Sequence, residues 1–211
     1  MALAPQPKRA RGGAIISRWQ TRCRAAARPF DRLMTPHLAH TPVLQTERLT
    51  LRAPIPSDSA AFVAFFGSDR AKFVGGPMAK GPAWRLFAAE IGHWAIHGFG
   101  MFTVLRKGDD TPLGIVGQWY PEGWPETEVG WVIFDPAVEG TGIAHEAAKA
   151  AIDHAWTTLG WTEMVSYIDH GNDRSVALAK RLGATLDPDA AIPYPDKPCY
   201  VYRHPKPGAA A

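Results

Sequence analysis

Two features in the middle of this 211-residue chain have residue types and spacing that suit chemistry: a carboxylate within an apolar run, and a glycine turn before a helix. The carboxylate is Glu128, in the run TEVGWVIF, and Gly130 leaves room beside it for a substrate or a water molecule. A carboxylate placed in this way can act as a general base, directly or through a water. The alternative role of Glu128 is that of an ordinary strand residue, either solvated or held in a salt bridge.

The glycine turn spans residues 139–144, EGTGIA, and leads directly into an amphipathic helix. A helix N-terminus has N–H groups without intrahelical acceptors and carries the positive end of the helix dipole, so this turn can seat a phosphate or pyrophosphate. A plain turn and helix cap is the alternative. A P-loop is excluded because no Gly-Lys-Ser/Thr follows. A dinucleotide fingerprint, and with it a nucleotide-dependent oxidoreductase, fits poorly because the residues DPAVE separate the glycines from their strand.

The elements that must position these two features follow from hydrophobic periodicity. Strands are predicted at residues 44–52, 101–106, 113–119, 127–134, 163–168, 184–186 and 199–203. Helices are predicted at residues 57–66, from Pro82 to Gly98, from the glycine turn to Gly160, and at 172–182. Alternation along the strand at 127–134 places Glu128, Gly130, Val132 and Phe134 on one face. The order predicts an α/β (α+β mixed) fold, with a mixed, mostly antiparallel, twisted sheet and helices on both faces.

The charge of the chain is unevenly distributed. Residues 1–43 carry eight basic residues and one acidic residue, whereas the remainder has a net charge of −4. We therefore expect a basic, disordered extension at 1–43, a single domain at 44–204 and a flexible end at 205–211. Residues 14–34 could alternatively form a basic amphipathic segment that contacts the ribosome, nucleic acid or a membrane.

The remaining composition limits the class of protein. No apolar run approaches the ~20 residues of a membrane helix, so we expect no membrane association of the domain. Cys23 and Cys199 lie far apart and form neither a disulfide framework nor a metal site, which favours a reducing, cytoplasmic setting. We expect no metal, and a monomer or a homodimer.

Four segments together resemble the GNAT N-acetyltransferase superfamily, over residues 44–203. The run EVGWVIFDP followed by EGTGIAHEA resembles its acetyl-CoA motif, Arg/Gln-x-x-Gly-x-Gly/Ala. The HEA that follows and the opening TERLTLRAP resemble the branch that acetylates ribosomal-protein N-termini, and NDRSVALAKRLGA resembles the later N-x-x-S…L-G-F/A motif. The resemblance implies a single GNAT-like domain whose sheet is splayed at the site of acetyl-CoA.

The resemblance also implies roles for individual residues. Backbone N–H near Val132 would hold the thioester carbonyl, backbone at Ile133 would bind the pantetheine arm, and backbone N–H groups of the turn would bind the pyrophosphate. The turn residues are Gly140, Thr141, Gly142, Ile143 and Ala144. Asn172 and Ser175 would contact the cofactor, although ordinary helix capping is their alternative role.

Two positions depart from the family pattern. Glu139 stands where the motif often has Arg or Gln, and a carboxylate beside a pyrophosphate is unfavourable unless it points away. Ala179 stands where many members have the tyrosine that protonates the leaving thiolate. The general acid therefore stays unassigned, as do the acceptor, the oligomeric state and the role of residues 1–43.

The expected function is transfer of an acetyl group from acetyl-CoA to a primary amine, on a protein N-terminus or a small molecule, by direct attack on the thioester. Deprotonating an amine with a pKa of ~10.4 at pH 7 costs about 4.6 kcal/mol, against about 1 kcal/mol for an α-amine near ~7.8, so one modest base suits a weakly basic amine. The alternatives are a non-catalytic acyl-CoA-binding module and, less favoured, the oxidoreductase above.

Several other polar or aromatic residues attract attention. His93 and His97 stand one helical turn apart near Glu90, but no third ligand is evident, so a surface or packing role is expected. His145 and His154 are expected to be exposed or half-buried, and His170 is a reserve acid or base. The tryptophans expected near an acceptor groove are Trp119, Trp124 and Trp131.

Overall fold

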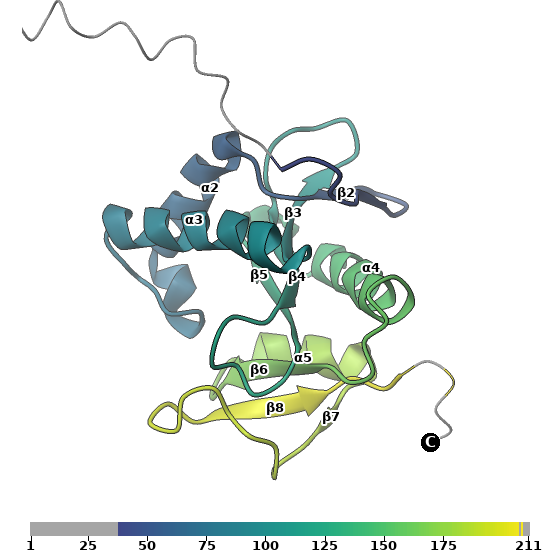
Figure 1. Cartoon of the computed structure of the whole chain (residues 1–211). Helices are drawn as coiled ribbons and strands as arrows, with labels where there is room; N and C mark the ends of the chain where they lie inside the picture. The colour runs from purple at the N-terminus through teal and green to yellow at the C-terminus, as the bar shows by residue number, and fades with distance from the viewer. Residues whose placement is uncertain (1–37, 207, 209–211) are drawn as a thin grey trace, which may run out of the picture. The chain divides into compact units, whose positions relative to one another are not determined.

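The computed structural model describes residues 38–206 and 208, which form one mixed sheet with helices on both faces (Figure 1). The strand order is β1-β2-β3-β4-β5-β6-β8-β7, and β5 and β6 are the parallel neighbours in an otherwise antiparallel sheet. The strands are β1 (Leu44–Gln45), β2 (Leu49–Arg52), β3 (Met101–Arg106), β4 (Gly114–Trp119), β5 (Glu128–Ile133), β6 (Val165–Asp169), β7 (Thr185–Leu186) and β8 (Cys199–Arg203). This architecture confirms the predicted fold class.

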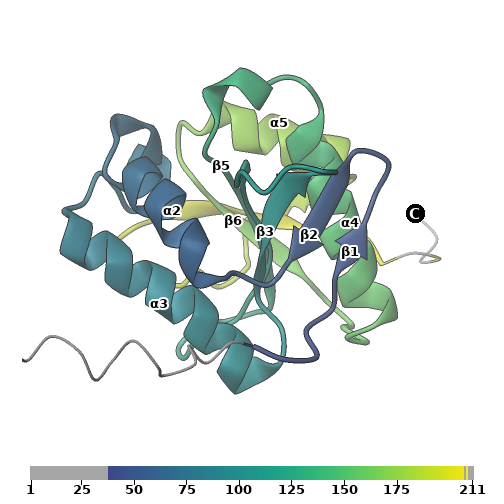
Figure 2. The same cartoon turned by 90° about the horizontal axis from the view of Figure 1, so that it is seen from above.

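The helices lie on opposite sides of the sheet, with α2 and α3 on one side and α4 and α5 on the other (Figure 2). They are α2 (Ser59–Phe66), α3 (Lys80–His97), α4 (Ile143–Thr157) and α5 (Asp173–Arg181), joined by the short 3-10 helices η2 (Pro56–Asp58), η3 (Asp69–Phe73) and η4 (Pro136–Val138). None of the helices in the described part of the chain is long and apolar enough to cross a membrane. The expectation for residues 1–37 lies outside the described residues.

Most predicted elements are present, and the differences occur where side chains redirect the backbone. The single strand predicted at 44–52 is two strands, because the Thr46 hydroxyl oxygen accepts the N–H of Leu49 at 3.0 Å and turns the chain. The helix predicted from Ser57 begins at Ser59, because Asp58 instead accepts bonds from the Arg52 guanidinium and closes a 3-10 turn. The end of α3 predicted at Gly98 is confirmed, and Gly98 adopts the left-handed conformation there, with φ of 76°.

The alternation predicted for β5 is confirmed, and it separates two cores. Val129 belongs to the cluster that packs α4 against the sheet, and Trp131 and Ile133 pack against it. Phe134 belongs to the cluster under α2 and α3, with Val132 packed against it. The face of β5 that carries Glu128 is therefore the face covered by α2 and α3.

The sheet opens between β5 and β6. The two strands share one register pair, Glu128 with Val165, whereas β4 and β5 pair continuously from Glu128 to Ile133. We call the opening beyond the Glu128–Val165 pair the splay gap. It is the interruption of the sheet that the sequence resemblance implies, and it leaves backbone of β5 without a neighbouring strand on one side.

Gly114 allows β5 to approach β4 closely, because a Cβ there would overlap the carbonyl oxygen of Val132. We predict that Gly114→Ala destabilises the domain by about 1–3 kcal/mol, the usual cost of overpacking. Gly92→Ala, in α3 with open space around its Cα, is the control and should be neutral or stabilise by about 0.5–1 kcal/mol. Denaturant unfolding of both variants measures this, and equal stability would contradict the close approach.

Candidate active site

A cavity of about 560 Å³ lies where the splay gap meets the α2–α3 face of the sheet. Its walls come from the segment between α2 and α3, from α3, from the β4–β5 connection, from β5 and β6, and from the loop before β8. All three tryptophans expected near an acceptor groove, Trp119, Trp124 and Trp131, line it. The walls are mainly apolar and aromatic, so the few carboxylates among them dominate its electrostatics.

Glu128 lies at the wall of this cavity, at the point where β5 and β6 part. Its Oε2 accepts a hydrogen bond from Trp124 Nε1 at 2.7 Å. Burial raises the pKa of Glu128 to about 7, although the bond from Trp124 and the backbone of Tyr167 oppose the rise. A carboxylate with a pKa near neutrality can both accept and release a proton under ordinary conditions, as a general base must.

The backbone of β5 presents free N–H groups to the splay gap. Phe134 donates its N–H to Leu113 O at 2.8 Å, and Ile133 lies opposite Gly114. Because amides alternate between the two sides of a strand, the N–H of Val132 points to β4, and those of Trp131 and Ile133 point to the gap. The ladder thus favours Trp131 and Ile133 over Val132 as donors to a ligand in the gap.

Asn172 and Ser175 lie at the start of α5, where the Asn172 side chain caps the helix and the Ser175 hydroxyl instead contacts Trp131. Asn172 accepts the N–H of Ser175 at 3.3 Å, and Ser175 Oγ accepts Trp131 Nε1 at 3.2 Å. Both residues also line the cavity. Ala179 is fully buried against β6 and β8, so no proton donor occupies the position of the family tyrosine.

The glycine turn follows β5 through η4 and ends at the N-terminus of α4. Gly140 and Gly142 have φ of 74° and 85°, the left-handed conformation that glycine adopts without strain. Within α4 the first bond back along the helix is from Glu146 N to Gly142 O, at 3.0 Å. The first-turn amides that precede Glu146 are therefore the free donors typical of an anion seat, whereas Thr141 N–H is engaged by Val138 O at 3.3 Å.

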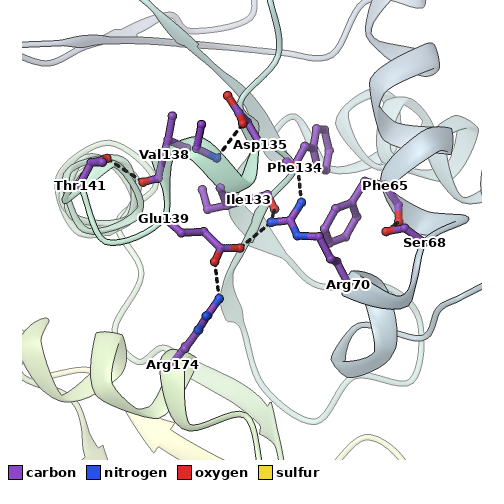
Figure 3. A network of polar contacts seen from close by, with 11 residues as sticks. Phe65, Ser68, Arg70, Ile133, Phe134, Asp135, Val138, Glu139, Thr141 and Arg174 are labelled. Atoms are coloured by element: carbon purple, nitrogen blue, oxygen red, sulfur yellow. Dashed lines mark hydrogen bonds and ion pairs between the residues drawn. The ribbon is translucent and has the colours of Figure 1, made fainter.

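Glu139 does not present a free carboxylate to this turn. Figure 3 shows it between Arg70, from η3, and Arg174, from α5, and it pairs with both guanidinium groups. Partial burial would raise the pKa of Glu139, but the hydrogen bond from Arg70 and the charge of Arg174 lower it overall. The unfavourable charge expected from the sequence is thus neutralised within the protein.

Arg70 also fixes the end of β5. Its guanidinium donates to Phe134 O and, at 3.1 Å, to Ile133 O, and it lies 5.3 Å from the centre of the Phe65 ring (Figure 3). A single side chain therefore connects η3, the end of β5 and the glycine turn. Neither Arg70 nor Arg174 was recognised in the sequence, because nothing in a surface loop or a helix start marks an arginine that meets a distant carboxylate.

A third arginine holds the other side of the turn. Arg48, in the β1–β2 turn, donates to Thr141 O at 3.0 Å and pairs with Glu146 at 2.6 Å. Thr46 Oγ1 donates to the same carboxylate at 2.5 Å. The run TERL at residues 46–49 resembles the family in the sequence, but its contact with the glycine turn is a tertiary feature that the run alone does not reveal.

Three of the histidines considered from the sequence, His93, His154 and His170, do not line the cavity. His93 is buried and uses both ring nitrogens, one with Phe99 O at 2.8 Å and the other with Tyr120 N–H at 3.0 Å. His154 is 6% exposed between α4 and Phe102, so the expectation of an exposed or half-buried residue was wrong. His170 lies against the Tyr200 ring. Within residues 38–206 and 208, no group of three or more His, Cys, Asp or Glu is arranged to hold a metal ion.

A second carboxyl lines the cavity, that of Glu90, which is noted in the sequence only as a neighbour of His93 and His97. Glu90, on α3, is 6% exposed and lines the same cavity as Glu128. Its position within a helical stripe of aromatic and apolar residues gave no sign that it would face a site.

Known proteins share this architecture. A family model described as "Acetyltransferase (GNAT) domain" matches residues 48–185. The crystal structure of an acetyltransferase from Agrobacterium tumefaciens is 35% identical, with a TM-score of 0.73, over 82% of this chain and 99% of its own. RimL, a ribosomal alpha-N-protein acetyltransferase solved in complex with coenzyme A, is 16% identical over 77% of this chain and 96% of its own, with a TM-score of 0.60, a likeness in fold alone.

A curated relative matches over a shorter stretch. The spermidine N(1)-acetyltransferase of Escherichia coli is 29% identical over 56 residues, which is 26% of this chain and 30% of that protein. The match spans less than a third of the relative's length.

The Arg70 contacts generate a stability prediction. Arg70→Met should lower the free energy of unfolding by about 1–3 kcal/mol, because two carbonyl groups at the end of β5 and the Glu139 carboxylate lose a charged donor. Arg174→Met is the matched control: this side chain is 84% exposed, so its loss should change stability by less than about 0.5 kcal/mol. Denaturant unfolding compares the two variants, and an equal, small effect would show that Arg70 does not hold β5.

Proposed function

This chain belongs to the GNAT acetyltransferase family, and on that premise we propose that it transfers the acetyl group of acetyl-CoA to a primary amine. One observation carries the proposal: the splay gap and the Glu128 carboxyl lie at the wall of the same cavity. The gap offers the free amides of β5 to an acetyl donor, and Glu128 offers a base. An activated acetyl donor and a base are the two requirements of amine acetylation. The proposed acceptor, a protein N-terminus or a small-molecule amine, goes beyond what family membership establishes.

The residues present fit acetyl-CoA. The amides of Trp131 and Ile133 would bind its arm in the splay gap, where they also lie suitably to stabilise an oxyanion. The first-turn amides of α4, with Gly140 and Gly142 shaping the turn, would bind the pyrophosphate through backbone donors. Asn172 and Ser175 lie at the cavity wall on the α5 side and would contact the same molecule. Acetyl-CoA supplies an acetyl group activated as a thioester.

The chain's own part in the reaction centres on the proton of the acceptor. Glu128 accepts a proton from the acceptor ammonium, and the neutral amine can then form the new C–N bond while the C–S bond breaks. The attacking nitrogen would release its second proton to solvent, and the leaving thiolate would take its proton from solvent or from another group, because Ala179 supplies none. Cys199 lines the cavity, but burial raises the pKa of its thiol, which disfavours the nucleophilic thiolate and supports direct transfer to the amine.

Mass spectrometry of amines incubated with acetyl-CoA and the full chain tests the proposal. Transfer to an amine is expected, together with binding of acetyl-CoA by calorimetry. Binding of acetyl-CoA without transfer to any amine in a broad panel would favour the alternative of a non-catalytic acyl-CoA-binding module. Ala179, at the position of the proton-donating tyrosine of many family members, is the reason to retain this alternative. The fold likeness to RimL supports including peptide N-termini in the panel, and the short match to the spermidine enzyme supports including small amines.

The pKa of Glu128 predicts the pH dependence of the reaction. Since a general base must be deprotonated, activity should rise with pH through about 7, and Glu128→Gln should lower it by roughly 10²–10⁴-fold. Trp124→Phe removes a hydrogen bond that stabilises the Glu128 carboxylate, so the midpoint of the variant's pH–activity profile should lie at higher pH than that of the parent. The titration of the acceptor amine is common to both proteins, so this shift reports Glu128. An unchanged midpoint, or an active Glu128→Gln variant, would remove Glu128 from the mechanism.

The role of backbone amides in the turn generates a second prediction. Glu139→Ala should bind acetyl-CoA at least as tightly as the parent, because it removes a carboxylate and leaves Arg70 and Arg174 free to meet the phosphates. Any gain should shrink as salt increases. Glu163→Ala, which removes the same charge from an exposed loop, is the control for net charge. A large loss of affinity on Glu139→Ala, measured by calorimetry, would mean that the turn does not bind pyrophosphate in this way.

A further inference from the structure

Glu90 is a second carboxyl in the cavity, and the mechanism above does not use it. It comes from the middle of α3, and its Oε2 is buried with no hydrogen-bond partner among the residues that the structure describes. The cavity wall around it is apolar and comes from α2, the segment before α3, α3 itself, β3 and β4. We call this region the acceptor half; besides Glu90 it consists of Phe66, Met78, Leu86, Met101, Ile115 and Trp119.

A buried carboxyl without a partner is costly, so it calls for a physical explanation. Burial, with a smaller contribution from the charge of Glu128, raises the pKa of Glu90 to about 8. The nearest titratable group on its own helix, His93, has both ring nitrogens engaged elsewhere. Among the described residues that line the cavity, the one basic side chain is Lys197, which pairs with Asp169 at 3.2 Å. Within the described part of the chain, no basic side chain that lines the cavity is therefore free to pair with Glu90.

We propose that Glu90 binds a second cationic group of the acceptor, apart from the amine that reacts, so that the acceptor is a diamine. The inference rests on the proposed acetyl transfer and gives its acceptor a chemical class. The two carboxyls then have different tasks: Glu128, at the splay gap, takes a proton from the amine that is acetylated, and Glu90, on α3, holds the amine that stays charged. Because an aliphatic diamine is strongly basic, the reaction carries the larger deprotonation cost of about 4.6 kcal/mol at pH 7 and not the smaller cost of an α-amine. The apolar side chains of the acceptor half would cover the methylene chain between them.

The same charges disfavour other amines. An amino acid would bring its carboxylate next to Glu90 and Glu128 with no free basic side chain to receive it, and a monoamine would leave Glu90 buried and unpaired. The second ammonium group of a diamine gives Glu90 a charge-assisted hydrogen bond, which is stronger than a neutral one. Glu90 releases its proton to solvent when the diamine binds, so the negative carboxylate and the positive ammonium neutralise each other. The acceptor half thus favours acceptors that carry two positive charges over those that carry one, in addition to its apolar contacts with the methylene chain.

Three acceptors of equal chain length test the inference on the full chain with acetyl-CoA: hexamethylenediamine, hexylamine and aminocaproic acid. We expect kcat/KM to be highest for the diamine and lowest for the amino acid. Glu90→Gln should lower kcat/KM for the diamine about tenfold or more, mainly through KM, as expected for loss of one charged hydrogen bond, and should change the value for hexylamine far less. Glu122→Gln is the control, because this carboxyl lines the cavity but is exposed. Equal use of diamine and monoamine by the parent protein, or equal losses for both on Glu90→Gln, would overturn the inference.

Binding measurements separate this inference from the proposed function. Calorimetry of the coenzyme A-loaded protein should show tighter binding of the diamine than of hexylamine, and Glu90→Gln should abolish the difference. If no amine is acetylated but this pattern holds, the proposed reaction fails and the diamine site stands. If amines are acetylated but the diamine binds no better, the diamine site fails alone.

The Glu90→Gln variant should also melt at a higher temperature than the parent, and the difference should be larger at pH 8 than at pH 6. The substitution removes the cost of burying a carboxylate, and this cost grows as pH rises toward the Glu90 pKa of about 8.

Discussion

The parting of β5 and β6 is the constraint on which the rest of the structure depends. Backbone N–H and C=O groups inside a protein need partners, and a sheet normally supplies them. Here β5 keeps β4 on one side but loses β6 after one residue pair, so its free edge must be satisfied in other ways. Arg70 donates to the carbonyl groups at the end of the strand, the Ser166 hydroxyl donates to Val129 O, and the amides of Trp131 and Ile133 stay available for a ligand.

Charge is balanced differently on the two sides of this gap. On the side of the glycine turn, the carboxylates of Glu139 and Glu146 are held by Arg48, Arg70 and Arg174, so the turn is fixed and its surroundings carry no excess of negative charge. In the cavity, Glu90 and Glu128 have no such partners, and burial raises the pKa of both. Paired carboxylates thus support the structure, and unpaired ones face the place where an amine would enter.

The sequence was sufficient for most features that depend on local pattern, although it missed the turn at Thr46 that separates β1 from β2. Alternation assigned the face of Glu128, and the two glycines located the start of α4, because strand and helix periods are written in adjacent residues. It was not sufficient for contacts made between distant segments. Arg70 meets Glu139 only because η3 folds over the end of β5, and Glu90 faces Glu128 only because α3 packs on that face of the sheet. Asp58 also moved the start of α2, since its partners Arg52 and Thr103 lie in neighbouring strands.

We propose that acetyl-CoA lies along the free edge of β5 and ends at the turn before α4. Amide hydrogen exchange of the full chain, compared with and without acetyl-CoA, tests this binding mode. We expect slower exchange at Trp131, at Ile133 and in the first turn of α4, with little change at Val132, whose N–H already bonds to β4. Protection confined to other parts of the domain, or none at these amides despite saturating acetyl-CoA, would exclude this binding mode.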